Sequence, residues 1–73
     1  NQHIEAAKCY ERALESDKSF VDAYHNIAWI LFKSKAYDDS IKYIDKGLAV
    51  KSDNSDLLSL KQKVRQAQED TAG

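Results

Sequence analysis

The hydrophobic positions of this chain recur at spacings of three, four and seven residues, which are the spacings of one face of an α-helix. The pattern predicts four helices, over about residues 2–16, 20–33, 37–50 and 54–69. The second and third are separated only by the short turn at 34–36. The hydropathy pattern therefore predicts an all-α protein.

The second predicted helix is the most apolar of the four. One face of its helical wheel carries Tyr24, Ile27, Ala28 and Leu31. The opposite side carries Asp22, His25, Trp29 and Phe32. A helix that is apolar on nearly all sides is usually buried between neighbours. Trp29 and Phe32 therefore either line an open groove or pack against a neighbouring helix or a second copy of the chain.

The last two predicted helices carry narrower apolar stripes. In the third helix the stripe consists of Tyr37, Ile41, Ile44 and Leu48. Gly47 in the same helix costs about 1 kcal/mol relative to Ala, so we expect a neighbouring backbone to approach closely there. In the fourth helix the stripe consists of Leu57, Leu60, Val64 and Ala67, and the other positions are mostly polar. A helix with a single apolar stripe is suited to closing the end of a stack of helices.

Two helix starts show a capping-box pattern, in which two side chains three residues apart satisfy exposed backbone N–H groups. Ser19 is followed by Asp22, and 34 residues later Asp53 is followed by Asp56. We expect both pairs to cap the helices that follow them. The third helix has Ala36 at the corresponding place, so its start is expected to be weak.

The chain resembles itself after a shift of 34 residues. The shift places Lys8, Glu11, Arg12, Ala13 and Leu14 on Lys42, Asp45, Lys46, Gly47 and Leu48. A fixed period of this length indicates helical hairpins stacked in a row. Such units bury their apolar faces on their neighbours rather than in a closed core.

With this period, the chain resembles the tetratricopeptide repeat, a helix-turn-helix unit of 34 residues. The first-helix positions of that family correspond to Tyr24, Ile27, Ala28 and Leu31. The second-helix positions correspond to Ala6, Tyr10 and Ala13 in the first copy, and to Ser40, Ile44 and Gly47 in the next. The resemblance implies four helices in antiparallel hairpins, stacked as a short right-handed α-solenoid. The chain departs from the family in having no Pro and in having Lys35 where Gly is usual.

The resemblance also implies a division into units. Residues 1–18 would be the second helix of a truncated repeat, 19–54 a complete repeat, 55–70 a capping helix and 71–73 a frayed tail. Because the chain begins inside a helical pattern and contains no Met, we expect it to be a segment of a longer protein. A unit of 73 residues buries little apolar surface, so we expect marginal stability when it is alone.

The charge and the apolar runs bear on the class of partner. The net charge is −1, from 11 basic and 12 acidic residues, and the signs are mixed along the chain. No basic stripe is present to neutralise phosphates, so we expect no nucleic-acid partner. The longest apolar run, 27–32, is too short to cross a bilayer, and we expect no membrane partner. The single Cys cannot form an internal disulfide, which fits the cytoplasm or another reducing intracellular compartment.

The residues for catalysis are sparse. Cys9, His3 and His25 are the only thiol and imidazoles, and a catalytic Cys–His pair must lie within hydrogen-bonding reach. Catalysis would rest on Cys9 and His25, which lie on different predicted helices. A metal site would need three or four converging ligands. We therefore expect no enzymatic activity, no cofactor and no metal, with Cys9 as a small core residue.

The resemblance implies that one side of the second helix faces the inner groove, where members of this family bind a peptide or another protein. The groove residues would be Asp22, His25, Asn26, Trp29, Phe32 and Lys33. Large aromatic side chains often supply most of the energy of such contacts. The interpretation is a protein–protein interaction module. The alternative is a structural role as the C-terminal cap of a solenoid, or in self-association as a homo-oligomer.

Overall fold

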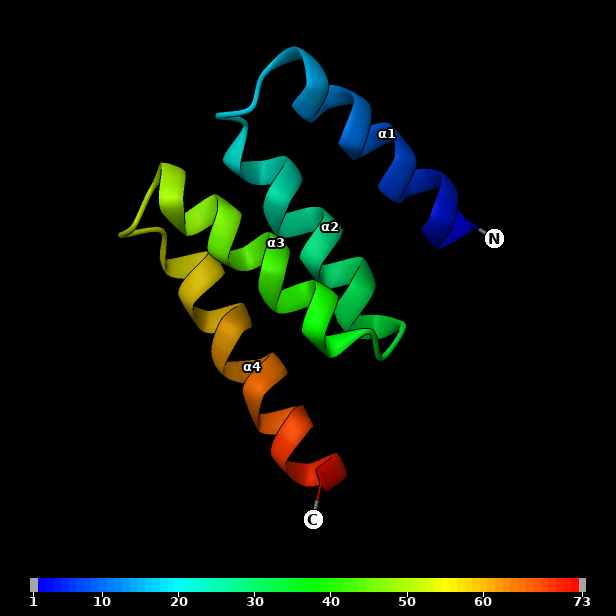
Figure 1. Ribbon diagram of the computed structural model, residues 1–73, viewed down its shortest axis with the longest axis vertical. Helices are drawn as coiled ribbons and strands as arrows, with labels where there is room; N and C mark the ends of the chain where they lie inside the picture. Colours follow the sequence, from blue (N-terminus) through cyan, green and yellow to red (C-terminus); the bar gives the residue numbers. More distant parts are fainter. Residues whose placement is uncertain (1, 73) are drawn as a thin grey trace.

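The computed structural model describes residues 2–72 of the chain. They form α1 (Gln2–Ser16), α2 (Val21–Lys33), α3 (Tyr37–Val50) and α4 (Ser55–Ala72), and every regular element among them is a helix (Figure 1). The predictions of an all-α fold and of four helices are confirmed. Consecutive helices run in opposite directions, so α2 and α4 point the same way (Figure 1).

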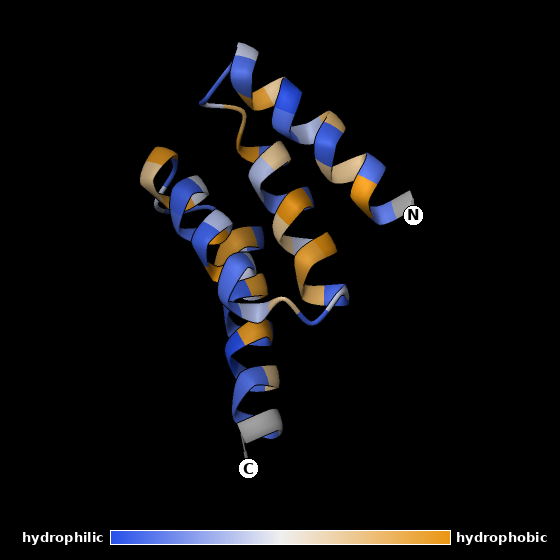
Figure 2. Cartoon of the chain, turned by 45° about the vertical axis from the view of Figure 1, so that its right-hand side comes forward, coloured by the Kyte–Doolittle hydropathy of each residue, from blue (hydrophilic) through white to orange (hydrophobic). Residues whose placement is uncertain are grey.

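The helix α2 is the centre of the arrangement. It packs against α1 on one side and against α3 on the other, and it also touches α4, which packs mainly on α3. This explains why α2 is the most hydrophobic helix, whereas α4 is mostly hydrophilic along its length (Figure 2). The result is a thin stack, with principal extents of 40, 32 and 14 Å.

Two buried clusters hold the stack together. One joins α2, α3 and α4 and contains Ala28, Ile44, Leu57, Leu60 and Val64. The other joins α1 to α2 and contains Leu14, Ala23, Tyr24 and Ile27. Each cluster lies between helices from neighbouring hairpins, so the apolar surface of a hairpin is buried by its neighbour.

Small residues allow the helices to approach closely. A Cβ on Gly47 would lie 2.7 Å from Cδ1 of Leu57 and 3.1 Å from Cβ of Tyr24. The close approach predicted at Gly47 therefore exists, but the approaching atoms belong to side chains rather than to backbone. Ser40 is fully buried and its hydroxyl donates a hydrogen bond of 2.7 Å to the carbonyl oxygen of Ala28. This bond joins α3 directly to α2.

The capping box predicted at Ser19 and Asp22 is wrong. Phe20 is the N-cap of α2 and makes no side-chain capping bond. Ser19 instead donates its N–H and its hydroxyl to Oδ1 of Asp17, at 3.0 and 2.5 Å. An ionised carboxylate two residues earlier is a strong acceptor and holds Ser19 in a local turn. These two bonds lower the pKa of Asp17 below its usual value.

The cap predicted for α4 at Asp53 and Asp56 is also wrong, by one residue. Oδ1 of Asn54 accepts a hydrogen bond of 2.9 Å from the N–H of Leu57. This is the N-cap bond to the third helical residue, and Asn is among the best residues for it. The weak start predicted for α3 agrees with the structure, in which Ala36 is an N-cap without a side-chain bond.

The turn between α2 and α3 places Lys35 in the left-handed region, at φ 65°. The N–H of Ala36 then reaches back to the carbonyl oxygen of Leu31 at 2.8 Å, which ends α2 tightly. Gly adopts this conformation without the steric cost that a side chain adds. The departure from the family pattern at Lys35 therefore falls on a conformationally demanding position.

Two further predictions differ from the structure. The helix α4 extends to Ala72, whereas the pattern predicted its end at about residue 69; Gly73 lies outside the described residues. Cys9 was expected in the core but is exposed. Because α1 packs mainly against α2, one stripe of α1 faces the stack and Cys9 lies off that stripe.

Candidate functional site

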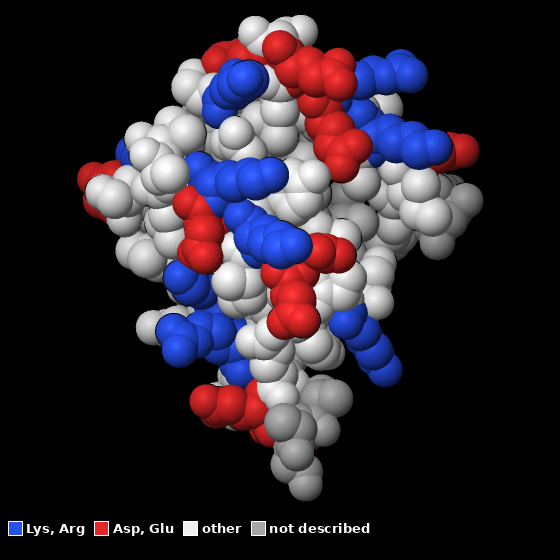
Figure 3. Space-filling model, in the orientation of Figure 1, with Lys and Arg blue, Asp and Glu red and all other residues white. Residues whose placement is uncertain are grey.

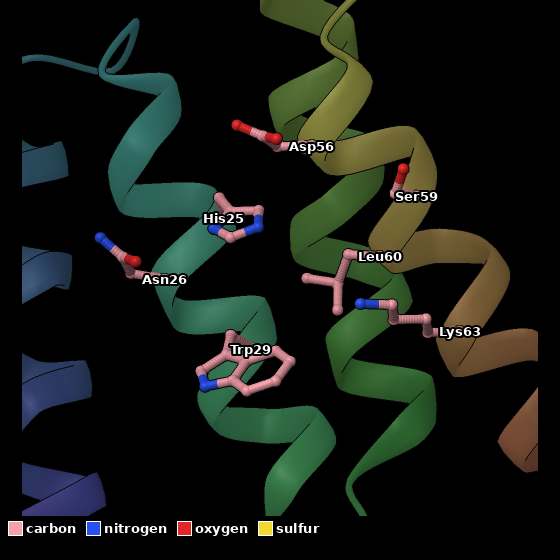
Figure 4. Close-up of a pocket in the computed structure, with 7 residues that line it drawn as sticks. All are labelled: His25, Asn26, Trp29, Asp56, Ser59, Leu60 and Lys63. Carbon is pink, nitrogen blue, oxygen red and sulfur yellow. The ribbon is translucent and has the colours of Figure 1, made fainter.

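A groove of about 470 Å³ runs between α2 and α4 (Figure 4). Its lining comes from both helices and consists of His25, Asn26, Trp29, Asp56, Ser59, Leu60 and Lys63. We call this set the α2–α4 groove. The side chains of Trp29 and Leu60 extend from opposite walls toward the space between the helices (Figure 4).

The 34-residue period explains why these side chains meet. The α2 positions 25, 26 and 29 correspond after the shift to the α4 positions 59, 60 and 63, all of which line the groove. Within each helix these residues are three or four apart, so they lie on one face. Because α2 and α4 point the same way, equivalent faces of two successive units form the two walls.

Trp29 is the largest side chain in the groove and is 39% exposed. Its ring centroid lies 5.9 Å from that of Phe32, with the rings tilted at 50°. Nζ of Lys33 lies 5.0 Å from the Trp29 ring centroid, within the range of a cation–π contact. Trp29 is thus braced by its own helix and still presents surface to the groove.

Phe32 takes a different position from Trp29. It is partly buried against the cluster between α2, α3 and α4, and its ring centroid lies 6.0 Å from that of Tyr37. The sequence left two possibilities for Trp29 and Phe32, an open groove or packing against a neighbouring helix, and each residue takes a different one. Phe32 packs against neighbouring helices, whereas Trp29 lines the groove.

The structure brings together half of the predicted groove residues. His25, Asn26 and Trp29 line the groove, whereas Asp22, Phe32 and Lys33 do not. The sequence reasoning missed the four residues on α4, which are Asp56, Ser59, Leu60 and Lys63. The signal that could have found them is the internal repeat, because adding 34 to positions 25, 26 and 29 gives three of the four.

The groove carries opposite charges along its length. Asp56 lies in the first turn of α4, and Lys63 lies seven residues later, with Leu60 between them. The ion pairs within the described residues, Lys42 with Asp39 at 4.0 Å and Lys61 with Asp45 at 2.7 Å, lie outside the groove. Elsewhere, acidic and basic side chains are mixed over the face seen in Figure 3.

The described residues give little basis for catalytic chemistry. No group of three or more His, Cys, Asp or Glu side chains in residues 2–72 could hold a metal ion. Of the candidate catalytic pair, His25 lines the groove, whereas Cys9 lies on α1 and is not among the lining residues. Over the same stretch, none of the helices combines the length and apolar character needed to cross a membrane.

A family model described as tetratricopeptide repeat matches residues 1–64. No curated protein and no solved structure matches the chain.

Proposed function

The chain belongs to the tetratricopeptide repeat family, and from this premise we propose that it binds a peptide segment of another protein in the α2–α4 groove. Repeats of this family typically mediate protein–protein interaction and are generally non-catalytic scaffolds. We extend the same role to this chain and assign it no reaction. Its single Cys fits an interaction in the cytoplasm or another reducing intracellular compartment.

The observation that carries the proposal is the position of Trp29. Its ring is braced by Phe32 and Lys33 and remains 39% exposed beside Leu60, which is 3% exposed. A rigid aromatic surface on the wall of a groove loses little conformational entropy when a partner covers it. An apolar partner side chain would find its contact surface there.

Polar side chains of the groove are suited to a peptide backbone. His25 and Ser59 line the groove from opposite helices, and the His25 ring points toward the space between them (Figure 4). The imidazole ring offers hydrogen-bonding nitrogens, and the Ser hydroxyl can both donate and accept. An extended peptide exposes unpaired N–H and C=O groups, which such side chains can satisfy.

The test compares two substitutions that each replace a large apolar side chain by Ala. Peptides are selected from a displayed random library on the wild-type chain, and their affinities are then measured for Trp29→Ala and for Leu58→Ala. Leu58 is 44% exposed on α4 but lies outside the groove, so it is the matched control. We expect Trp29→Ala to weaken binding at least tenfold, on the order of a hot-spot residue, and Leu58→Ala to leave it unchanged. If Trp29→Ala retains its helicity in circular dichroism and binds the peptides as tightly as wild type, the peptides do not bind in the α2–α4 groove.

A second candidate function is that of a cap. Leu57, Leu60 and Val64 are the α4 members of the buried cluster that joins α2, α3 and α4, while the outer positions of α4 are polar. On this proposal, a chain ending at Asn54 exposes the cluster and loses its cooperative unfolding transition. A truncated chain that unfolds like the full one would contradict it.

The other possible structural role is self-association. Ile4 is 56% exposed and, with Ile30 and Leu31, lines an apolar hollow between α1 and α2. A second copy covering this hollow would give a dimer that Ile4→Glu dissociates in analytical ultracentrifugation. A chain that stays monomeric at all concentrations would exclude it.

A further inference from the structure

The charges in the α2–α4 groove are ordered along its axis. Asp56 lies at the end where α4 begins, and Lys63 lies farther along the same wall, nearer to Trp29 (Figure 4). The helix α2 points the same way; outside the groove, its acidic residue Asp22 is in the first turn and its basic residue Lys33 is in the last turn. The groove itself has an acidic end at Asp56 and a basic end at Lys63.

The helix dipoles reduce the difference in charge between the two ends of the groove but do not cancel it. A helix N-terminus carries about half a positive charge, which offsets part of the charge of a carboxylate in the first turn. Asp22 and Asp56 are both in this position, and each retains the remainder of its negative charge. Lys63 is in the middle of α4, where the dipole has little effect, so the basic end keeps a full positive charge.

The spacing of these charges matches a short extended peptide. Lys63 comes seven residues after Asp56 in the helix, and at a rise of 1.5 Å per residue this is about 10 Å along the axis. An extended chain advances about 3.3 Å per residue, and its alternate side chains point to the same face. Three side chains at alternate positions span about 13 Å between the outer Cα atoms, and long charged side chains reach inward to cover the difference.

We infer that the groove selects an extended peptide in which a basic, a large apolar and an acidic residue occupy alternate positions. The basic side chain lies at the Asp56 end and the acidic one lies beside Lys63. The apolar one lies over Leu60, between these two charges, and reaches the ring of Trp29 on the opposite wall. This inference depends on the proposed function, because it specifies the peptide that the same groove binds. It adds a requirement that apolar contact alone would not impose.

The test uses four capped, labelled peptides with the cores Lys-Ala-Leu-Ala-Glu, Lys-Ala-Leu-Ala-Lys, Glu-Ala-Leu-Ala-Glu and Gln-Ala-Leu-Ala-Gln. Binding is followed by fluorescence anisotropy at low salt. Since an exposed charge pair contributes a modest free energy, we expect the mixed-charge peptide to bind roughly three- to tenfold tighter than either like-charged peptide. The preference should shrink at high salt, which screens exposed charges.

Charge reversal in the protein should reverse the preference. We expect Lys63→Glu to favour the dibasic peptide and Asp56→Lys to favour the diacidic one. Arg65→Glu changes the net charge as Lys63→Glu does but lies outside the groove, so it should keep the wild-type order.

The outcomes separate this inference from the proposed function. If all four peptides bind equally and the binding still requires Trp29, the groove binds peptides but the charge requirement is wrong. The same conclusion follows if the preference persists unchanged at high salt. If neither these peptides nor any library peptide binds, the proposed function itself fails, and this inference fails with it.

Discussion

Gly47 on α3 faces Leu57 on α4 so closely that a Cβ on the glycine would lie 2.7 Å from Cδ1 of the leucine. Leu57 is fully buried, and Cβ of Tyr24 lies 3.1 Å from the same point. No Cβ fits at that distance without movement of a packed side chain. This contact sets how closely the last helix can approach the central hairpin.

We predict that Gly47→Ala destabilises the chain. Replacing Gly by Ala inside a helix contributes about 1 kcal/mol of stability, whereas overpacking a core costs about 1–3 kcal/mol. The expected net loss is about 1 kcal/mol, measured by urea unfolding. In the background of Leu57→Ala, which removes the nearest atoms but leaves Cβ of Tyr24 at 3.1 Å, the loss caused by the same substitution should become smaller. A loss that is equal in both backgrounds would show that the contact is not its cause.

A substitution at Lys35 is expected to stabilise the chain. At φ 65° its side chain adds steric cost in the left-handed region. We predict that Lys35→Gly raises the free energy of unfolding by about 0.5 kcal/mol, the steric relief exceeding the added entropy of the unfolded chain. The matched control is Lys51→Gly, because Lys51 follows α3 with φ −140° and gains nothing from Gly. Thermal unfolding of both variants checks the prediction, and a gain in both would contradict it.

Asn54 is predicted to be the residue that stabilises the start of α4. Asn54→Ala removes the bond to the N–H of Leu57 and should cost about 1 kcal/mol. Asp53→Ala, one residue earlier, should change stability by much less. Urea unfolding of both variants measures the difference. If Asp53→Ala were the more damaging substitution, the cap would lie where the sequence pattern suggested.

Tyr43 joins α1 to α3, because its hydroxyl donates a hydrogen bond of 3.1 Å to Glu11. Burial, followed by this bond and the negative charge of Glu11, raises the pKa of Tyr43 above its ordinary value of 10.0. The folded chain thus holds this proton to higher pH than the unfolded chain. The contribution of Tyr43 is complete below its ordinary pKa and is lost as the pH rises through the raised value.

We therefore predict that Tyr43→Phe lowers stability at neutral pH by up to about 1 kcal/mol, and that this deficit diminishes at alkaline pH. The measurement is the urea midpoint of both chains between pH 7 and about pH 11, a range that brackets the ordinary pKa of Tyr. Other tyrosines titrate in both chains, so the informative quantity is the difference between the two curves. Parallel curves would show that the Tyr43 hydroxyl does not stabilise the packing of α1.

The positions of the turns show where local sequence reasoning reached its limit. Polar residues stood at the expected helix starts, yet Ser19 bonds back to Asp17, and Asn54 rather than Asp53 caps α4. Several neighbouring side chains could satisfy the same N–H groups, and the path of the chain decides among them. The pattern therefore predicted that turns occur there but not which oxygen accepts each bond.

By itself, the sequence determined the helices, the repeat and the family. The helical periodicity of about 3.6 residues and the 34-residue repeat can both be read directly from the sequence. Neither depends on which helices come into contact in the folded chain. Only the tertiary structure decided that Phe32 turns to the core, that Trp29 faces a groove, and that Lys63 forms part of its other wall. Both aromatic residues occupy the same side of one helix, so their roles depend on where α4 and Tyr37 come to lie. That placement results from packing between distant segments, which no single helix encodes.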